Sequence, residues 1–439
     1  MRALITRRFV PAIVLAASLT LALGASPAAA SAGDLDPTFG SGGVVTTSFG
    51  ADAAGANAIA IRASDGSMIA AGYDVQSHGE AFALAKYLSD GSPDPSFGGG
   101  TGMVTTSFSH ANAVVTAVAI QQTTGKIVVA GFVASPPNNR FAVARYNPDG
   151  TLDTTFSHDG KVITDFGGNA EANAVAILPN NDVVVAGFAA PPGPGTDYAL
   201  ARYTDKGKLD PSFGTGGLVT TNFFGSDSGI NSLAVQANGD LVTAGVTASG
   251  SNTQFSVARY NSNGTLDQSF GVSGVQFTAF ETNPTDQATA VRLGTGGRIL
   301  VAGSATKNVP GAKTKIAVAR YTSNGTLDTS FSTDGKTTTS IGSGAAAYGI
   351  GIEPAGGIVV AGTVGTQPPH FDMAVVRYTP AGALDSGFGT GGIVRTDLGA
   401  DERAFGMRIQ SDGRIVVAGA GWPPNSLISH FLLARYQSA

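Results

Sequence analysis

Short runs of alternating apolar and small residues recur along the chain from residue 31 to its end. In one copy, Thr116–Ile120 alternates, Thr123–Lys126 has the composition of a hairpin turn, and Ile127–Phe132 continues as a second apolar run. Phe141–Tyr146 and Lys161–Phe166 follow as two further runs with turn residues between them. Helical periodicity is missing from these runs. Each copy therefore predicts four short antiparallel strands.

Three sequence landmarks each occur seven times, about every 60 residues. An L-D-x-x-F motif begins at Leu35, Leu152, Leu209, Leu266, Leu327 and Leu384, and at Pro93 with proline in place of leucine. An Ala-Gly step ends at Gly72, Gly131, Gly187, Gly245, Gly303, Gly362 and Gly419. An Arg/Lys-Tyr pair ends at Tyr87, Tyr146, Tyr203, Tyr260, Tyr321, Tyr378 and Tyr436. Seven four-stranded units predict an all-β fold, a single seven-bladed β-propeller covering residues 31–439.

The phase of the repeat predicts how the ring closes. The chain enters the repeat at the L-D motif and the outer strand Val44–Phe49, and it ends on a third strand, Phe431–Tyr436. We therefore expect the N-terminal strand to pair with the C-terminal three strands, which leaves no exposed sheet edge. The same phase places Asp36 beside Arg435 across the closure.

The repeat unit resembles a known family. Units of the form A-V-A-I-x-x-x-G-K-I-V-V-A-G, followed by F-A-V-A-R-Y-N-x-D-G-T-L-D-x-x-F-G, are similar to delta-60 repeats, a bacterial family of β-propeller repeats. The resemblance extends from Leu35 to Tyr436, with Pro93 for leucine and Lys86 for arginine as departures in the first complete unit. It implies an exported β-propeller, and it brings no catalytic residues with it.

Residues 1–30 have a different character. Arg2, Arg7 and Arg8 precede the apolar stretch Ala12–Gly24, and Ala28–Ala30 supplies small residues for cleavage. This pattern predicts a cleaved secretory signal peptide and a secreted, extracellular protein. Twin-arginine export stays open as an alternative, although the residue order around the arginine pair favours general secretion.

The net charge and the absence of cysteine limit the classes of partner that this chain is expected to bind. The chain has no cysteine and a net charge of −5, which becomes −8 once the three arginines of the signal are removed. No basic stripe remains for nucleic acid, and we expect no membrane anchor after the signal is cleaved. We expect a monomer without a cofactor, whose partner is an extracellular protein or glycan.

The repeated aspartate could be read as a calcium ligand, because Asn147, Asp149 and Asp153 are spaced like the ligands of a calcium-binding loop. The bidentate glutamate of such a loop is replaced by His158. The five histidines also lack metal-ligand spacing. A structural Arg–Asp pair in each blade is therefore the better interpretation, and no metal site is predicted.

The two faces of the ring are expected to differ. The loops between the second and third strands and those between blades share one face and vary in every copy, whereas the turns of the other face repeat closely. The variable loops include Tyr73–Glu80, Pro136–Arg140, Pro191–Asp197, Ser304–Lys315, Gln367–His370 and Gly421–His430. The ligand-binding candidates on this face are Trp422, His430, His370, Tyr73 and His78.

Three functions are compatible with this pattern. The first is a non-catalytic binding or scaffold protein that recognises a protein or glycan through its variable loops. The second is a secreted hydrolase or lyase acting on polysaccharide, and the third is a structural protein of the cell envelope. An enzyme would need carboxylates near the axis, for which the candidates are Asp74, Glu80, Asp197, Asp227, Glu281, Asp372 and Glu402. A channel poor in acids and with exposed aromatic side chains would favour binding.

Overall fold

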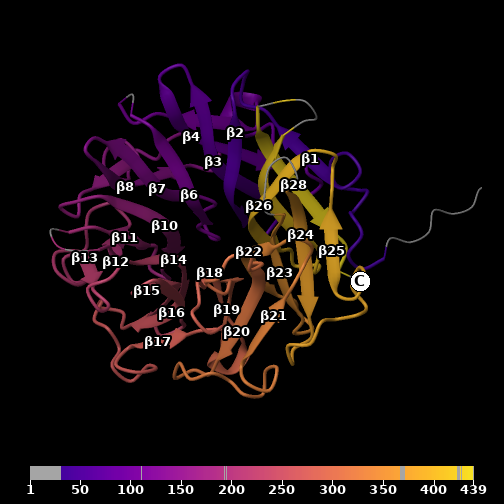
Figure 1. Cartoon of the computed structure of the whole chain (residues 1–439). Helices are drawn as coiled ribbons and strands as arrows, with labels where there is room; N and C mark the ends of the chain where they lie inside the picture. Colours follow the sequence, from indigo (N-terminus) through magenta and orange to yellow (C-terminus); the bar gives the residue numbers. More distant parts are fainter. Residues whose placement is uncertain are drawn as a thin grey trace, which may run out of the picture.

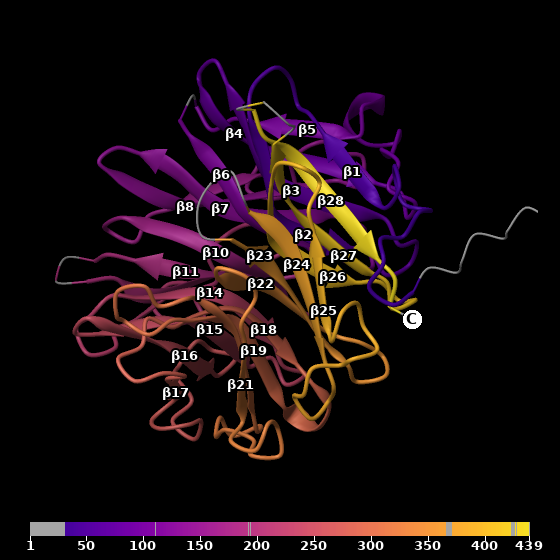
Figure 2. The same cartoon turned by 45° about the vertical axis from the view of Figure 1, so that its right-hand side comes forward.

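The computed structural model describes residues 31–109, 111–191, 193, 195–365, 371–422, 426 and 428–438. The predicted signal peptide, residues 1–30, lies outside the described residues. The described chain forms seven four-stranded antiparallel sheets arranged as blades around a central axis (Figures 1 and 2). This arrangement confirms the predicted seven-bladed β-propeller.

Each of blades 1 to 6 consists of four consecutive strands, which follow one another from the channel outward. Blade 1 contains β2 (Ala54–Ile61), β3 (Met68–Gln76), β4 (Gly79–Tyr87) and β5 (Met103–Thr106), and blade 2 contains β6 (Ala113–Ile120), β7 (Ile127–Ser135), β8 (Asn138–Tyr146) and β9 (Lys161–Thr164). Blade 3 contains β10 (Ala170–Ile177), β11 (Val183–Ala189), β12 (Asp197–Tyr203) and β13 (Leu218–Thr221), and blade 4 contains β14 (Ser228–Val235), β15 (Leu241–Ser249), β16 (Asn252–Tyr260) and β17 (Val275–Thr278). Blade 5 contains β18 (Gln287–Leu293), β19 (Ile299–Ala305), β20 (Lys315–Tyr321) and β21 (Lys336–Thr339), and blade 6 contains β22 (Ala345–Ile352), β23 (Ile358–Val364), β24 (Asp372–Tyr378) and β25 (Ile393–Thr396).

Blade 7 joins the two ends of the chain. It contains β26 (Asp401–Ile409), β27 (Ile415–Trp422), β28 (His430–Tyr436) and, as its outer strand, β1 (Val44–Thr47). The antiparallel register runs from Val44 opposite Ala434 to Thr47 opposite Phe431. Figure 1 shows the indigo N-terminal strand beside the yellow C-terminal strand. The predicted ring closure is confirmed.

Strand ends differ in detail from the sequence expectation. The outer strands stop earlier than predicted: β1 ends at Thr47 rather than at Phe49, and β9 ends at Thr164 rather than at Phe166. The two phenylalanines turn into the interface with the next blade instead of extending the ladder. The helical elements of the described chain are two short 3-10 turns, Gly98–Gly100 and Thr295–Gly297. No helix among the described residues is long and apolar enough to cross a membrane.

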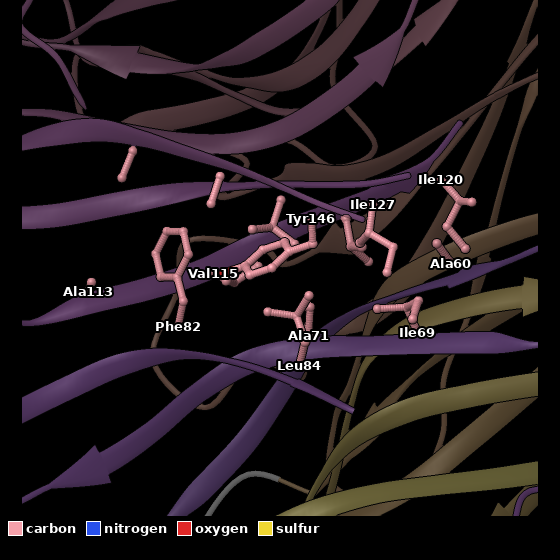
Figure 3. Packing of buried hydrophobic residues seen from close by; sticks show 14 of the residues in the cluster. Ala60, Ile69, Ala71, Phe82, Leu84, Ala113, Val115, Ile120, Ile127 and Tyr146 are labelled. Carbon is pink, nitrogen blue, oxygen red and sulfur yellow. The ribbon is translucent and has the colours of Figure 1, made fainter. Parts of the chain in front are cut away.

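The hydrophobic core is divided among the interfaces between neighbouring blades. Figure 3 shows one of them, in which Phe82 and Leu84 of blade 1 pack against Val115, Ile127 and Tyr146 of blade 2. Alanines are frequent in all seven clusters, and these small side chains let the sheets approach closely. The apolar face of each blade is thus covered by its neighbours, so a single blade would have no core of its own.

The landmark residues of the repeat make two sets of contacts, one between neighbouring blades and one within each blade. The hydroxyl of each repeated tyrosine bonds to a threonine at the end of the previous blade's outer strand, as Tyr146 does to Thr106 at 2.9 Å. The other pairs are Tyr87–Thr47, Tyr203–Thr164, Tyr260–Thr221, Tyr321–Thr278, Tyr378–Thr339 and Tyr436–Thr396. Each repeated base bonds to the aspartate of its own blade: Lys86–Asp94, Arg145–Asp153, Arg202–Asp210, Arg259–Asp267, Arg320–Asp328, Arg377–Asp385 and Arg435–Asp36. Because these contacts recur in every blade, we assign them a structural role.

Candidate functional site

The central channel is lined by the innermost strands, each of which contains a β-bulge. In five blades the bulge side chain donates a hydrogen bond of 2.6–2.9 Å to a carbonyl of the next blade; these residues are Asn57, Thr116, Asn173, Asn231 and Thr289. In blades 6 and 7 the bulge residues are Tyr348 and Phe405, whose rings meet edge to face at 5.7 Å. None of the described residues that line the channel is acidic.

A pocket lies at the variable face between blades 6 and 7. It has a volume of about 430 Å³, which falls within the usual range for small-molecule sites. Leu398, on the connector from β25 to β26, closes one side. The remaining lining comes from all four strands of blade 7: Thr46, Ser48, Glu402, Gly421, Trp422, His430 and Leu432. Blade 7, which joins the two ends of the chain, therefore carries the pocket, and the segment around β1 supplies part of its wall.

The pocket exists because this interface departs from the repeat. Two positions after the repeated Ala-Gly glycine, blade 7 has Gly421, where blades 1 to 6 have Asp74, Val133, Ala189, Thr247, Ala305 and Val364. A Cβ at Gly421 would come within 2.9 Å of the Leu432 side chain. The backbone of Gly421 has no positive φ, so the absence of a side chain, and not backbone conformation, is what distinguishes this position.

A second departure concerns the residue that seals each interface on this face. In five interfaces a phenylalanine follows the outer strand by two residues and packs against an aromatic ring of the third strand, as Phe49 does against Phe431 at 4.7 Å. Two interfaces lack this aromatic pair: the corresponding residues are Ile341 and Ile316 between blades 5 and 6, and Leu398 and Met373 between blades 6 and 7. The interface between blades 6 and 7 is the one that combines the missing aromatic pair with a glycine, Gly421, at the position two residues after the Ala-Gly step.

Three carboxylates gather beside the pocket. The nearest oxygens of Asp372, Asp397 and Glu402 lie within 4.8 Å of one another. Burial raises the pKa of Glu402, and the charges of Asp372 and Asp397 add to the rise, while two backbone N–H groups oppose it. Oxygen atoms at this spacing suit a hard cation. However, each carboxylate already accepts from a protein donor: Arg395 for Asp372, the Gly399 N–H for Asp397, and the Leu398 and Ala400 N–H groups for Glu402.

Trp422 and His430 form the part of the pocket that is suited to contact a ligand. Trp422 is partly buried, and the guanidinium of Arg403 lies 5.1 Å from its ring and 4.4 Å from the ring of Phe371. His430 is also partly buried, and its Nδ1 has no hydrogen-bond partner among the described residues. The ring of Trp422 is thus held in place by Arg403, whereas the Nδ1 atom of His430 is buried and does not reach the surface of the pocket.

The other predicted binding residues do not join this pocket. Tyr73 lies on β3 of blade 1 beside Gly55, and His78 lies in the exposed hairpin that follows, with Nδ1 2.8 Å from the Ser77 hydroxyl. His370 lies outside the described residues. Sequence reasoning missed Gly421, Leu398, Thr46 and Ser48. A position-by-position comparison of the seven copies would have found the first two, because each is smaller than most of its counterparts.

The acids proposed for the enzyme alternative are dispersed. None of the seven lines the central channel, and only Glu402 lines the pocket between blades 6 and 7. Several are held by local partners: Asp197 by Asn222 at 2.6 Å, Asp227 by the Thr196 N–H at 3.0 Å, and Glu281 by Lys315 at 2.6 Å. The described channel lining therefore holds none of these acids, and it includes Tyr348, whose side chain is exposed.

Comparisons with known proteins agree with the fold. Residues 63–97, 122–156, 236–270, 297–331 and 410–438 match the family model described as "Domain of unknown function (DUF5122) beta-propeller". The chain therefore carries repeats of a β-propeller family. No curated protein matched the sequence.

Two solved structures are similar to this chain. The polysaccharide lyase Uly1 is 10% identical, with 88% of this chain and 90% of the lyase covered and a TM-score of 0.50. A protein of unknown function from Dyadobacter fermentans DSM 18053 is 12% identical, with 74% and 94% covered and a TM-score of 0.42. At these identities the similarity concerns the propeller architecture alone.

Proposed function

We propose that the protein is an exported, non-catalytic β-propeller that binds a glycan in the pocket between blades 6 and 7. The observation that carries the proposal is the pocket itself, which Trp422 and His430 line together with Thr46 and Ser48. A sugar ring has an apolar face suited to an aromatic side chain and hydroxyls suited to polar groups around it. The proposal includes assignment of the repeats as delta-60 repeats, secretion through the signal in residues 1–30, and a monomeric protein.

The lining of the channel, which includes no acid among the described residues, supports binding over catalysis. Polysaccharide hydrolysis commonly uses two carboxyl groups about 5 to 9.5 Å apart that flank the scissile bond. In the described structure, Glu402 is the only acid lining the pocket, and the neighbouring Asp372 and Asp397 accept hydrogen bonds from Arg395 and the Gly399 N–H, so all three carboxylates beside the pocket are already held by the protein. The fold shared with the lyase Uly1 is the reason to test turnover directly, and a structural role in the envelope would show as no glycan binding at all.

A glycan array probed with the purified protein tests this proposal. We expect specific binding that falls at least tenfold, or about 1.4 kcal/mol, when Trp422→Ala removes the aromatic wall. Gly421→Val should have a similar effect because it fills the pocket, and blades 2 and 6 already carry valine at this position. Phe224→Ala is the matched control, since Phe224 is 72% exposed and does not line the pocket.

Three results would contradict the proposal. Equal glycan binding by the wild type, Trp422→Ala and Gly421→Val would remove the pocket from the site. A protein partner bound in the pocket, with no glycan bound, would replace the ligand class. Release of reducing ends or unsaturated sugars from a bound polysaccharide, lost in Glu402→Gln, would replace the non-catalytic function with the enzyme alternative.

A further inference from the structure

Two arginines enter the central channel at a position where the other blades have almost no side chain. Three residues after the bulge, the innermost strand has Arg292 in blade 5 and Arg408 in blade 7. The same position in the other blades is Ala60, Ala119, Ala176, Ala234 and Gly351. Arg292 and Arg408 flank blade 6, whose glycine adds no side chain between them. A position that holds alanine or glycine in five blades therefore holds arginine in the other two.

Neither arginine has a carboxylate partner among the described residues. Arg292 bonds to the carbonyl of Val291 at 3.3 Å and Arg408 to the carbonyl of Met407 at 2.8 Å, each the preceding residue of its own strand. The repeated arginines outside the channel, in contrast, each bond to an aspartate, as Arg435 does to Asp36. The guanidinium fork is suited to bidentate bonds with an oxyanion, and most of its donors are unused here.

The described surroundings of the pair hold apolar and neutral polar residues and no carboxylate. Both arginines line the central channel beside the bulge residues. They also line a cavity of about 470 Å³ at one end of the channel, on the face whose turns repeat closely from blade to blade (the repetitive face). That cavity is also lined by Gln122, Gln410 and Ser411, and no described lining residue is acidic. Burial lowers the pKa of Arg408, and the nearby charge of Arg292 lowers it further. Two like charges held together in this way are stabilised by a bound anion.

We propose that Arg292 and Arg408 form an oxyanion-binding site in the central channel, which takes a sulfate, phosphate or carboxylate group from the repetitive face. This site is distinct from the pocket between blades 6 and 7 and lies at the opposite end of the innermost strands. The ligand is either a free inorganic anion or the acidic group of a larger molecule, such as a uronate at the end of a glycan. Both sources present the same chemistry to the two guanidinium groups.

Calorimetric titration at constant ionic strength tests the site, with sodium sulfate, sodium phosphate and galacturonate as separate probes in chloride buffer. We expect saturable binding of at least one probe, weakened tenfold or more by Arg292→Ala or Arg408→Ala and lost in the double variant. Alanine restores the residue that four blades carry, so these variants should fold. Binding of the inorganic ions alone would identify a free anion, and binding of galacturonate would identify an acidic sugar.

Controls separate the channel from general surface charge. Arg298→Ala removes an exposed arginine of blade 5 that pairs with Asp328, and it should leave anion binding unchanged. Without anion, the double variant should melt at the same temperature as the wild type or higher, because repulsion between the two cations is removed. Should the double variant unfold, Arg408→Gln gives the same test with less change in volume. No binding of any probe, or equal binding by wild type and double variant, would overturn the proposal.

Discussion

At the scale of single residues, the closure depends on a buried charged cluster around Asp36. Arg435 Nε lies 2.7 Å and Arg414 Nη1 2.9 Å from one carboxylate oxygen of Asp36, and the Thr38 hydroxyl donates to the other at 2.7 Å. Burial by itself would raise the pKa of Asp36, but the hydrogen bonds from Thr38 and the charges of the two arginines outweigh it and lower the pKa to about 2. The carboxylate is therefore strongly preferred in its charged form.

Replacing this carboxylate should destabilise the whole ring. Asp36→Asn leaves Arg435 buried without a full counter-charge, which typically costs about 3–5 kcal/mol. Asp385→Asn is the matched control in blade 6, and it should cost about 1 kcal/mol or less because the Asp385 side chain is 33% exposed. Urea unfolding at neutral pH measures both free energies.

Acid should remove the same contribution. Because the folded pKa of Asp36 lies below the value of about 3.9 in an unfolded chain, its stabilisation is complete above about pH 4 and is lost as the pH falls toward 2. The difference in unfolding free energy between wild type and Asp36→Asn should shrink over this interval. A difference that stays constant from pH 7 to pH 2, or equal losses for the Asp36 and Asp385 variants, would contradict this account.

Scaffold residues were easier to predict from sequence than the residues that line the pocket between blades 6 and 7. The pairing of Asp36 with Arg435 follows from a motif present in every copy, so its role can be inferred from repetition alone. Gly421 and Leu398 act through the volume they leave empty, and an empty volume depends on neighbours that lie in other strands. Trp422 and His430 were proposed because they are unusual side chains in variable loops, and both line the pocket, whereas Tyr73 and His78 met the same criteria but line no part of it.

At the scale of elements, the four-residue strand β1 has contacts beyond its own ladder. Leu35 forms a bridge with Tyr436, the Gly33 N–H bonds to the Gln437 carbonyl at 2.9 Å, and the Ala32 carbonyl accepts from the Gly389 N–H of blade 6. The segment of residues 31–50 thus ties blade 7 to blade 6 as well as completing its sheet. It also supplies Thr46 and Ser48 to the pocket.

Deleting residues 31–50 should therefore cost much more than the loss of a frayed terminus. We expect the melting temperature to fall on the order of 10 °C, with loss of the single cooperative transition, because β28 becomes an exposed edge. A synthetic peptide of residues 31–50 added in excess should restore stability, and a scrambled peptide should not. A truncated chain that melts like the chain beginning at residue 31 would show that closure by β1 is unimportant.

At the scale of the whole molecule, both proposed sites occur where the sevenfold repeat is broken. The pocket arises from Gly421, Leu398 and Met373 at one interface, and the channel arginines replace alanine in two blades. The architecture could be predicted because it depends on what the copies share. The sites could not be placed in the same way, because the two faces and the channel bring together residues from different blades. The variable face was expected to carry the function, and the arginine pair adds a candidate at the other end of the channel.

The most direct test of the proposed function uses Trp422, the only tryptophan of the chain. Its fluorescence reports on the pocket between blades 6 and 7 without any label. Titration with a glycan selected on the array should change the emission saturably, with the same dissociation constant as an independent binding measurement, and Gly421→Val should abolish the change. A glycan that binds with unaltered Trp422 emission, and equally well to Trp422→Ala, would contradict the assignment of this pocket as the binding site.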